Sequence, residues 1–185
     1  MEFKEYVEMS NHFDKRTNMH IGLVQDYANR IADKYPEFEE LRDIVIDHDA
    51  SKFEEPEHEP YLYITWKYKM AAEGKEFEVP SHIADKMNIA TERHVLFNKH
   101  HPEYWCGETE NLINSDDRDT PRTEIIFAQD MPNVYIAEMV ADWFAVSKER
   151  GNHPKDWADK NVGVRWDFTK EQSDLIYDLI ESVWV

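Results

Sequence analysis

Apolar residues recur at helical spacing through the first fifty residues of the chain. In residues 11–35, one face of a predicted helix carries four residues at i, i+4, i+7 and i+11: His20, Val24, Tyr27 and Ile31. Pro36 ends that helix. The spacing of Leu41, Val45 and His48 predicts a second helix over residues 37–50. Two histidines therefore lie on faces that are expected to be buried.

The middle of the chain predicts two more helices. Residues 54–60 contain two prolines and read as a loop in which Glu54, Glu55 and Glu57 are solvated. Residues 61–73 form an aromatic helix that Gly74 ends. A further helix begins at the N-cap Ser81, and Pro102 ends it. Its apolar stripe, at spacings of three and four, is Ile83, Met87, Ala90, His94, Phe97 and His101.

The last third predicts a long loop and two helices. Apart from a short patch at Glu124–Phe127, residues 106–132 lack clear periodicity, which is typical of a lid or a mobile segment. They contain three aspartates that we interpret as solvated, because the glycine and glutamate of a calcium loop are missing: Asp116, Asp117 and Asp119. Residues 133–150 are predicted helical, with Glu138 and Asp142 one turn apart, and residues 152–168 irregular. A capping-box pattern at residues 169–172 opens a final helix.

Together these segments predict an all-α fold, a single-domain helical bundle of about six main helices that covers residues 1–185. A core over about 15–150 would carry the chemistry, and a C-terminal helix at 169–184 would pack on it. Five glycines among 185 residues and abundant Glu, Lys, Ala and Met also favour helix over sheet.

The net charge of −18 argues against direct nucleic-acid binding and against an anionic membrane, because phosphate is repelled. A small phosphorylated substrate stays possible, since a metal ion and a lysine can reverse the potential locally. The sequence shows no signal peptide and no run of about 18 apolar residues, and it has one cysteine, Cys106. We therefore expect a cytoplasmic protein, with the oligomeric state left open.

Residues with metal-binding chemistry occur at four places in the chain. His48 and Asp49 are adjacent and precede Lys52, and His20 lies upstream. Three of these places also have a simpler interpretation: His20 is typical of a hydrogen-bonded core residue, His48-Asp49 of a capped turn, and Asp142 of a surface acid. The remaining candidates are the histidines of residues 94–101: His94, His100 and His101.

The order of these residues along the chain resembles the order of the metal ligands in the HD superfamily of metal-dependent phosphohydrolases. The resemblance covers roughly residues 15–150 and implies four ligands for a primary metal: His20, His48, Asp49 and Asp142. It implies that Asp49 bridges a second metal, if present, which His94 with His100 or His101 would also bind. The double histidine lies closer to His94 than is usual in that superfamily. Lys52 would contact the anionic group of the substrate.

The segments around these residues are also similar to an HD-like family of unknown function that is common in bacteriophages and bacteria: His-Asp-Ala-Ser-Lys-Phe, Asn-Lys-His-His-Pro-Glu-Tyr-Trp and Glu-Met-Val-Ala-Asp-Trp. If the protein is phage-encoded, we expect it in the host cytoplasm. This similarity adds to the fold prediction and says little about the substrate.

The leading hypothesis is hydrolysis of a phosphoester in a nucleotide or another small phosphorylated substrate. One or two ions of Mn, Fe, Co, Ni or Zn would activate water, and Asp49, Lys52 and Glu138 would take catalytic roles, with Glu138 or a histidine moving a proton. One alternative is a di-iron oxygenase of the same superfamily, such as myo-inositol oxygenase. Another is a non-catalytic helical accessory or binding protein.

Overall fold

The computed structural model describes residues 3–106 and 125–184, and these residues are mostly helical. The predicted all-α fold is confirmed, with seven α-helices among the described residues: α1 (Phe3–Lys34), α2 (Leu41–Ile44), α3 (His58–Ala72), α4 (Ser81–Phe97), α5 (Asn133–Arg150), α6 (Pro154–Asn161) and α7 (Lys170–Val183). Four 3-10 turns join them: η1 (Pro36–Phe38), η2 (Val45–Asp47), η3 (Ala50–Phe53) and η4 (Pro102–Trp105). Two short strands, β1 (Ile126–Phe127) and β2 (Trp166–Asp167), pair in parallel.

The chain divides into two compact units, each of which is assembled from separate stretches of sequence. The first unit comprises residues 1–19 and 49–94, and the second comprises residues 20–48 and 95–185. Two helices, α1 and α4, contribute residues to both units. The sequence-based prediction of one domain over residues 1–185 stays a prediction.

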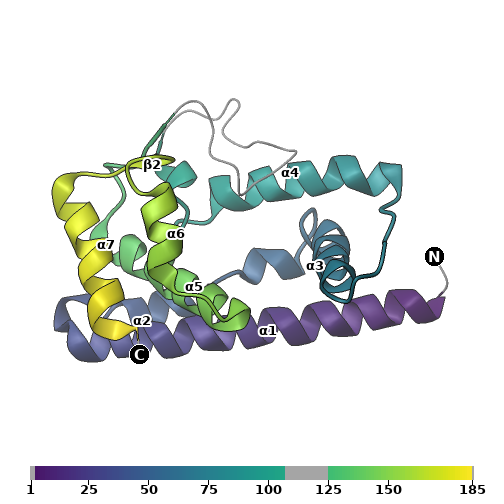
Figure 1. The fold of residues 1–185 in the computed structure, drawn as a ribbon, viewed down its shortest axis with the longest axis horizontal. Coiled ribbons are helices and arrows are strands. Elements are labelled where there is room, and N and C mark those ends of the chain that lie inside the picture. The colour runs from purple at the N-terminus through teal and green to yellow at the C-terminus, as the bar shows by residue number, and fades with distance from the viewer. Residues whose placement is uncertain (1–2, 107–124, 185) are drawn as a thin grey trace. The chain divides into compact units, whose positions relative to one another are not determined.

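The first unit is built from the N-terminal part of α1, the turn η3, α3 and most of α4 (Figure 1). Met9 and Phe13 are one turn apart on α1 and are fully buried. They form one apolar cluster with residues from the other two helices: Tyr61, Leu62, Tyr63, Trp66, Ile83 and Ala90. Burial of this aromatic-rich face stabilises the unit by the hydrophobic effect.

The second unit has its own apolar core, to which the C-terminal part of α1, α2, α5, α6 and α7 contribute. Helices α5, α6 and α7 pack against one another (green to yellow in Figure 1). Phe144 of α5 and Leu179 of α7 are fully buried in this core, as are Val24 and Ile31 of α1. The inward face of α5 is thus fixed by apolar packing, and its polar side chains take defined positions.

Local signals in the sequence account for the ends of the last helices. Thr169 and Gln172 form the predicted capping box at the start of α7, in which each side chain accepts a hydrogen bond from the other residue's backbone N–H. Gly151, with a φ of 69°, ends α5 in the left-handed conformation that glycine adopts without strain.

Three predicted helix boundaries were wrong. Helix α1 begins at Phe3 rather than near residue 11, because no Pro or Gly interrupts residues 3–10 and Met9 is buried in the first unit. Helix α3 begins at His58, inside the predicted loop. Helix α4 ends at Phe97, so His101 lies outside the helix whose stripe it was predicted to continue.

Residues 37–50 do not form one helix. They form η1, the four-residue helix α2 and η2, and the backbone of His48 is then extended with φ −54° and ψ 128°. Asp49 follows with a φ of 59°, a left-handed conformation in which a helix cannot continue. The apolar spacing of Leu41, Val45 and His48 arises from consecutive short turns.

Residues 152–168, predicted irregular, contain α6 and β2. The prediction failed because α6 has only eight residues and few of them are apolar, so its helical spacing is too short to stand out. Most of the predicted loop at 106–132, including Asp116, Asp117 and Asp119, lies outside the described residues. Among the residues that the structure does describe, no helix has the length and apolar character needed to span a membrane.

Candidate metal centre

His20 lies on the buried face of α1, as its spacing predicted, and each of its ring nitrogens faces a carboxylate of α5. Nε2 lies 3.0 Å from Oδ1 of Asp142, and Nδ1 lies 2.7 Å from Oε1 of Glu149. A hydrogen bond on both sides requires a proton on both nitrogens. A metal ion between Nε2 and Asp142 would replace one of these protons.

His48 reaches the same helix from the end of η2. Its Nδ1 lies 2.9 Å from Oε1 of Glu138, and the side chain is completely buried. Glu138, Asp142 and Glu149 occupy positions i, i+4 and i+11 of α5, which is one helical face. The structure therefore sets a row of three carboxylates against His20 and His48 within the second unit.

Two groups of side chains in the second unit could each hold a metal ion. The first consists of His20, His48 and Asp142, and the second of His48, His100 and Glu138. Within each group, one potential ligand atom per residue lies within 4.8 Å of the others. The ring centroids of His48 and His100 are 4.2 Å apart. His48 belongs to both groups, which places it at the centre of the candidate site.

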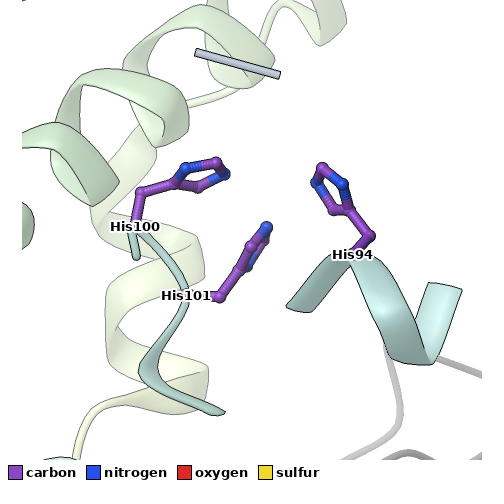
Figure 2. Close-up of side chains that lie close together, drawn as sticks. All are labelled: His94, His100 and His101. Atoms are coloured by element: carbon purple, nitrogen blue, oxygen red, sulfur yellow. The ribbon is translucent and has the colours of Figure 1, made fainter. Parts of the chain in front are cut away.

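His100 and His101 lie in the short segment between α4 and η4. Their ring centroids are 4.3 Å apart, and Figure 2 shows both imidazoles, together with that of His94 on the last turn of α4. His101 precedes Pro102, the first residue of η4, and its backbone is extended. The double histidine is thus presented by a turn rather than by a helical stripe.

A buried ion pair fixes the segment that carries the double histidine. Glu103 in η4 is 2% exposed, and its Oε1 lies 3.4 Å from Nη2 of Arg165 and accepts a hydrogen bond from Nε1 of Trp166 at 3.1 Å. The η4 turn also packs against β1, which pairs with β2. These contacts tie the chain just after His100 and His101 to the strand pair of the second unit.

Two carboxylates of the site keep their charge in spite of burial. Burial raises the pKa of Glu138, but hydrogen bonds from His100 and His48 and the charges of these rings outweigh it, so the pKa is lowered. Burial likewise raises the pKa of Asp142, and the hydrogen bond from His20 with nearby imidazole charge lowers it well below its usual range. Both groups are therefore ionised, the form that binds metal ions.

The first unit contains a second buried polar cluster, which forms around Asp49. Nε2 of His94 lies 3.2 Å from Oδ1 of Asp49, and the ammonium group of Lys52 donates to the other carboxylate oxygen. On the far side of its ring, Nδ1 of His94 lies 3.0 Å from Oε2 of Glu57, which also accepts a hydrogen bond from Ser51 at 2.9 Å. Asp49, Lys52 and His94 are thus brought together.

The prediction for Glu57 was wrong, and Glu149 was not predicted as a site residue. Glu57 was predicted to be solvated with Glu54 and Glu55, but it is only 1% exposed, whereas those two are exposed. No local pattern distinguishes it, because its partner His94 is distant in sequence. Glu149 could have been found, since it lies seven residues after Asp142 on the same face of a predicted helix.

The ligand roles of the predicted residues stay predictions, but their placement agrees with such roles. His20, His48, Asp142, His100 and Glu138 gather in the second unit. His101 contacts His100.

Residues 9–182 match a family described as a family of unknown function, DUF5662. Neither a curated protein nor a solved structure matched the chain. The matched range contains every candidate site residue and runs through both units.

Proposed function

The chain belongs to the DUF5662 family, and we propose that it is a metal-dependent phosphohydrolase that acts on a nucleotide or another small phosphorylated substrate. The observation that carries the proposal is the group of two buried histidines, His20 and His48, with the partly buried Asp142. Buried imidazoles and a carboxylate brought together from α1, η2 and α5 are costly unless hydrogen-bonded or bound to a metal ion.

The donor set fits a divalent transition metal. Ligand atoms about 2.1 Å from an ion lie roughly 3 to 3.5 Å from one another in tetrahedral or octahedral coordination. The separation of 3.0 Å between Nε2 of His20 and Oδ1 of Asp142 suits that geometry. Two imidazoles with a carboxylate are compatible with Mn, Fe, Co, Ni and Zn, and they do not select among these metals.

A metal ion held there would supply an activated water at neutral pH and would polarise a phosphoryl oxygen. The residues of the chain would orient the substrate. Lys52 carries three donor hydrogens, of which Asp49 accepts one in the structure, so the others could bind a substrate phosphate. Glu138 is ionised and bound to two imidazoles, which favours a role in holding these rings over the proton transfer predicted from the sequence.

The resemblance to the HD superfamily supports the same proposal. In that superfamily the aspartate that follows the paired histidine is a ligand, which assigns this role to Asp49, the chain neighbour of His48. The superfamily order of His, His-Asp and distal Asp is present as His20, His48-Asp49 and Asp142. We therefore include Asp49 in the proposed ligand set.

A second candidate function, di-iron oxygenation, is favoured by the group of His48, His100 and Glu138. Because His48 belongs to both groups, a second ion could bind beside the first. Two irons per chain with a visible charge-transfer band would support oxygenation. One Mn, Co or Zn ion with release of phosphate from a nucleotide panel would support hydrolysis.

The test combines elemental analysis with an assay of phosphate release from a panel of nucleotides and sugar phosphates. The wild type would be compared with His48→Asn, Asp49→Ala and the control His82→Asn, which changes an exposed histidine. We expect wild type and control to carry a stoichiometric metal and to release phosphate, and the other two variants to lose both properties.

Absence of a transition metal from wild type after reconstitution would overturn the metal site. Retention of metal and activity by His48→Asn would do the same, because neither property would then depend on the proposed ligand. Metal binding without hydrolysis of any substrate in the panel would support the proposed metal site but would reject the proposed reaction.

A further inference from the structure

Around the candidate histidines, glutamate and aspartate carboxylates face different nitrogens of the imidazole ring. In the following contacts between described residues, the glutamates face Nδ1: Glu149 on His20 at 2.7 Å, Glu138 on His48 at 2.9 Å and on His100 at 3.4 Å, and Glu57 on His94 at 3.0 Å. Two aspartates face Nε2: Asp142 on His20 at 3.0 Å and Asp49 on His94 at 3.2 Å.

This division is independent of the unit in which the pair occurs. Glu149, His20 and Asp142 form one carboxylate–imidazole–carboxylate series in the second unit. Glu57, His94 and Asp49 form another in the first unit, from different elements. Ordinary buried ion pairs would not require the same nitrogen in each case, so the arrangement indicates a common chemical demand on the rings.

The demand follows from the chemistry of histidine. A neutral imidazole carries its proton on one nitrogen, and only the other nitrogen can bind a metal ion. A carboxylate that accepts a hydrogen bond from Nδ1 therefore fixes the proton there and makes the lone pair of Nε2 available. It also makes the ring a stronger ligand and restricts its rotation.

We propose that Glu57, Glu138 and Glu149 are positioning residues that hold these histidines with the proton on Nδ1, so that Nε2 is presented for metal binding. This inference rests on the metal site of the proposed function. Glu138 serves two rings, His48 and His100, through the same oxygen, so it has the largest share in this role. Ser51, which donates to Glu57, keeps that carboxylate in place for His94.

The test uses Glu149, which faces His20 and is less deeply buried than the other two glutamates. Glu149→Gln keeps an oxygen that can accept from Nδ1 but loses the charge. Glu149→Leu loses both. Glu171→Gln, an exposed position in the first turn of α7, is the matched control. Circular dichroism would confirm that each variant is folded.

Two measurements would be made on protein labelled with ¹⁵N-histidine. Long-range ¹H–¹⁵N NMR spectra show which nitrogen of His20 carries a proton, both in metal-free protein and after addition of Zn²⁺ alone. Competition with a chelating dye gives the Zn²⁺ affinity. We expect Nδ1 of His20 to be protonated in wild type, in Glu149→Gln and in the control, and to lose its proton in Glu149→Leu.

We expect the Zn²⁺ affinity to fall about 10- to 100-fold in Glu149→Gln, at least as far in Glu149→Leu, and not in the control. Unchanged protonation of His20 and unchanged Zn²⁺ affinity in Glu149→Leu would overturn the inference. If Glu149→Leu does not fold, the affinity of Glu149→Gln relative to the control decides. Failure of wild type to bind any metal would reject the proposed function, while the protonation of Nδ1 in metal-free protein would still decide whether Glu149 positions the ring.

Discussion

Replacing Arg165 by methionine should destabilise the second unit strongly. Arg165 is 5% exposed and is the charged partner of the buried Glu103. Methionine keeps much of the side-chain volume but leaves the carboxylate with the neutral indole N–H of Trp166 as its donor. Removal of one partner of a buried ion pair costs about 3–5 kcal/mol, against a total stability of about 5–15 kcal/mol for a typical protein.

The measurement is urea denaturation monitored by tryptophan fluorescence and by circular dichroism. EDTA is present so that metal binding does not add to stability. Lys155→Met is the control, because it breaks an ion pair with Asp159 whose side chains are 44% and 51% exposed. An exposed pair of this kind contributes below about 1 kcal/mol. The double variant Glu103→Leu with Arg165→Met should recover part of the loss, since no buried charge is left unpaired.

The same substitution should also weaken metal binding, because Glu103 lies two residues after His101 and anchors the turn that presents the double histidine. If Arg165→Met destabilises the protein no more than Lys155→Met does, the buried pair does not hold this segment and the reasoning is refuted.

Two further predictions concern the surface and the last helix. NMR titration should give the Glu73 carboxyl group a pKa of about 2, because hydrogen bonds from Lys69 and Lys75 favour its charged form. The two hydrogen bonds stabilise the folded protein above the ordinary carboxyl pKa, and this stabilisation is lost as the pH falls through the lowered pKa. Replacing both lysines by methionine should return the pKa of Glu73 toward the ordinary value. Thr169→Ala removes the acceptor for the N–H of Gln172 and should lower the free energy of unfolding by about 1 kcal/mol, whereas Thr169→Ser should not; equal stability of both variants in urea would contradict the capping role.

The elements that the sequence predicted well are those with a long apolar stripe or a chemical signal at the end. Helix α5 was predicted over 133–150 and observed as Asn133–Arg150, since it begins after Pro132 and ends at Gly151. The capping box of Thr169 and Gln172 placed the start of α7 correctly. In both cases the information lies within a few neighbouring residues.

The features that the sequence could not predict depend on contacts between distant residues. The parallel pair of Ile126–Phe127 with Trp166–Asp167 has two residues per strand, too few for a period-two pattern. The burial of Glu57 depends on His94, which is 37 positions away. The five candidate histidines were found from residue type and order, whereas the pairing of a glutamate with Nδ1 of four of them needed the fold.

The left-handed backbone of Asp49 was also beyond prediction. A positive φ is uncommon for a residue other than glycine, although aspartate tolerates it better than most. The sequence pattern continued a helix through His48, and nothing in residues 44–53 marks the reversal. The change in direction sends two neighbouring side chains to different partners, His48 to Glu138 and Asp49 to His94.

The interleaving of the two units bears on how the protein can be divided. The chain passes from one unit to the other three times, after residues 19, 48 and 94, so no single cut separates one unit from the other. A fragment that ends at residue 94 would contain the whole first unit together with residues 20–48, deprived of α5 and α7. It would expose the apolar face of α1 that carries Val24 and Ile31, and truncation would therefore yield an aggregating product rather than a smaller working protein.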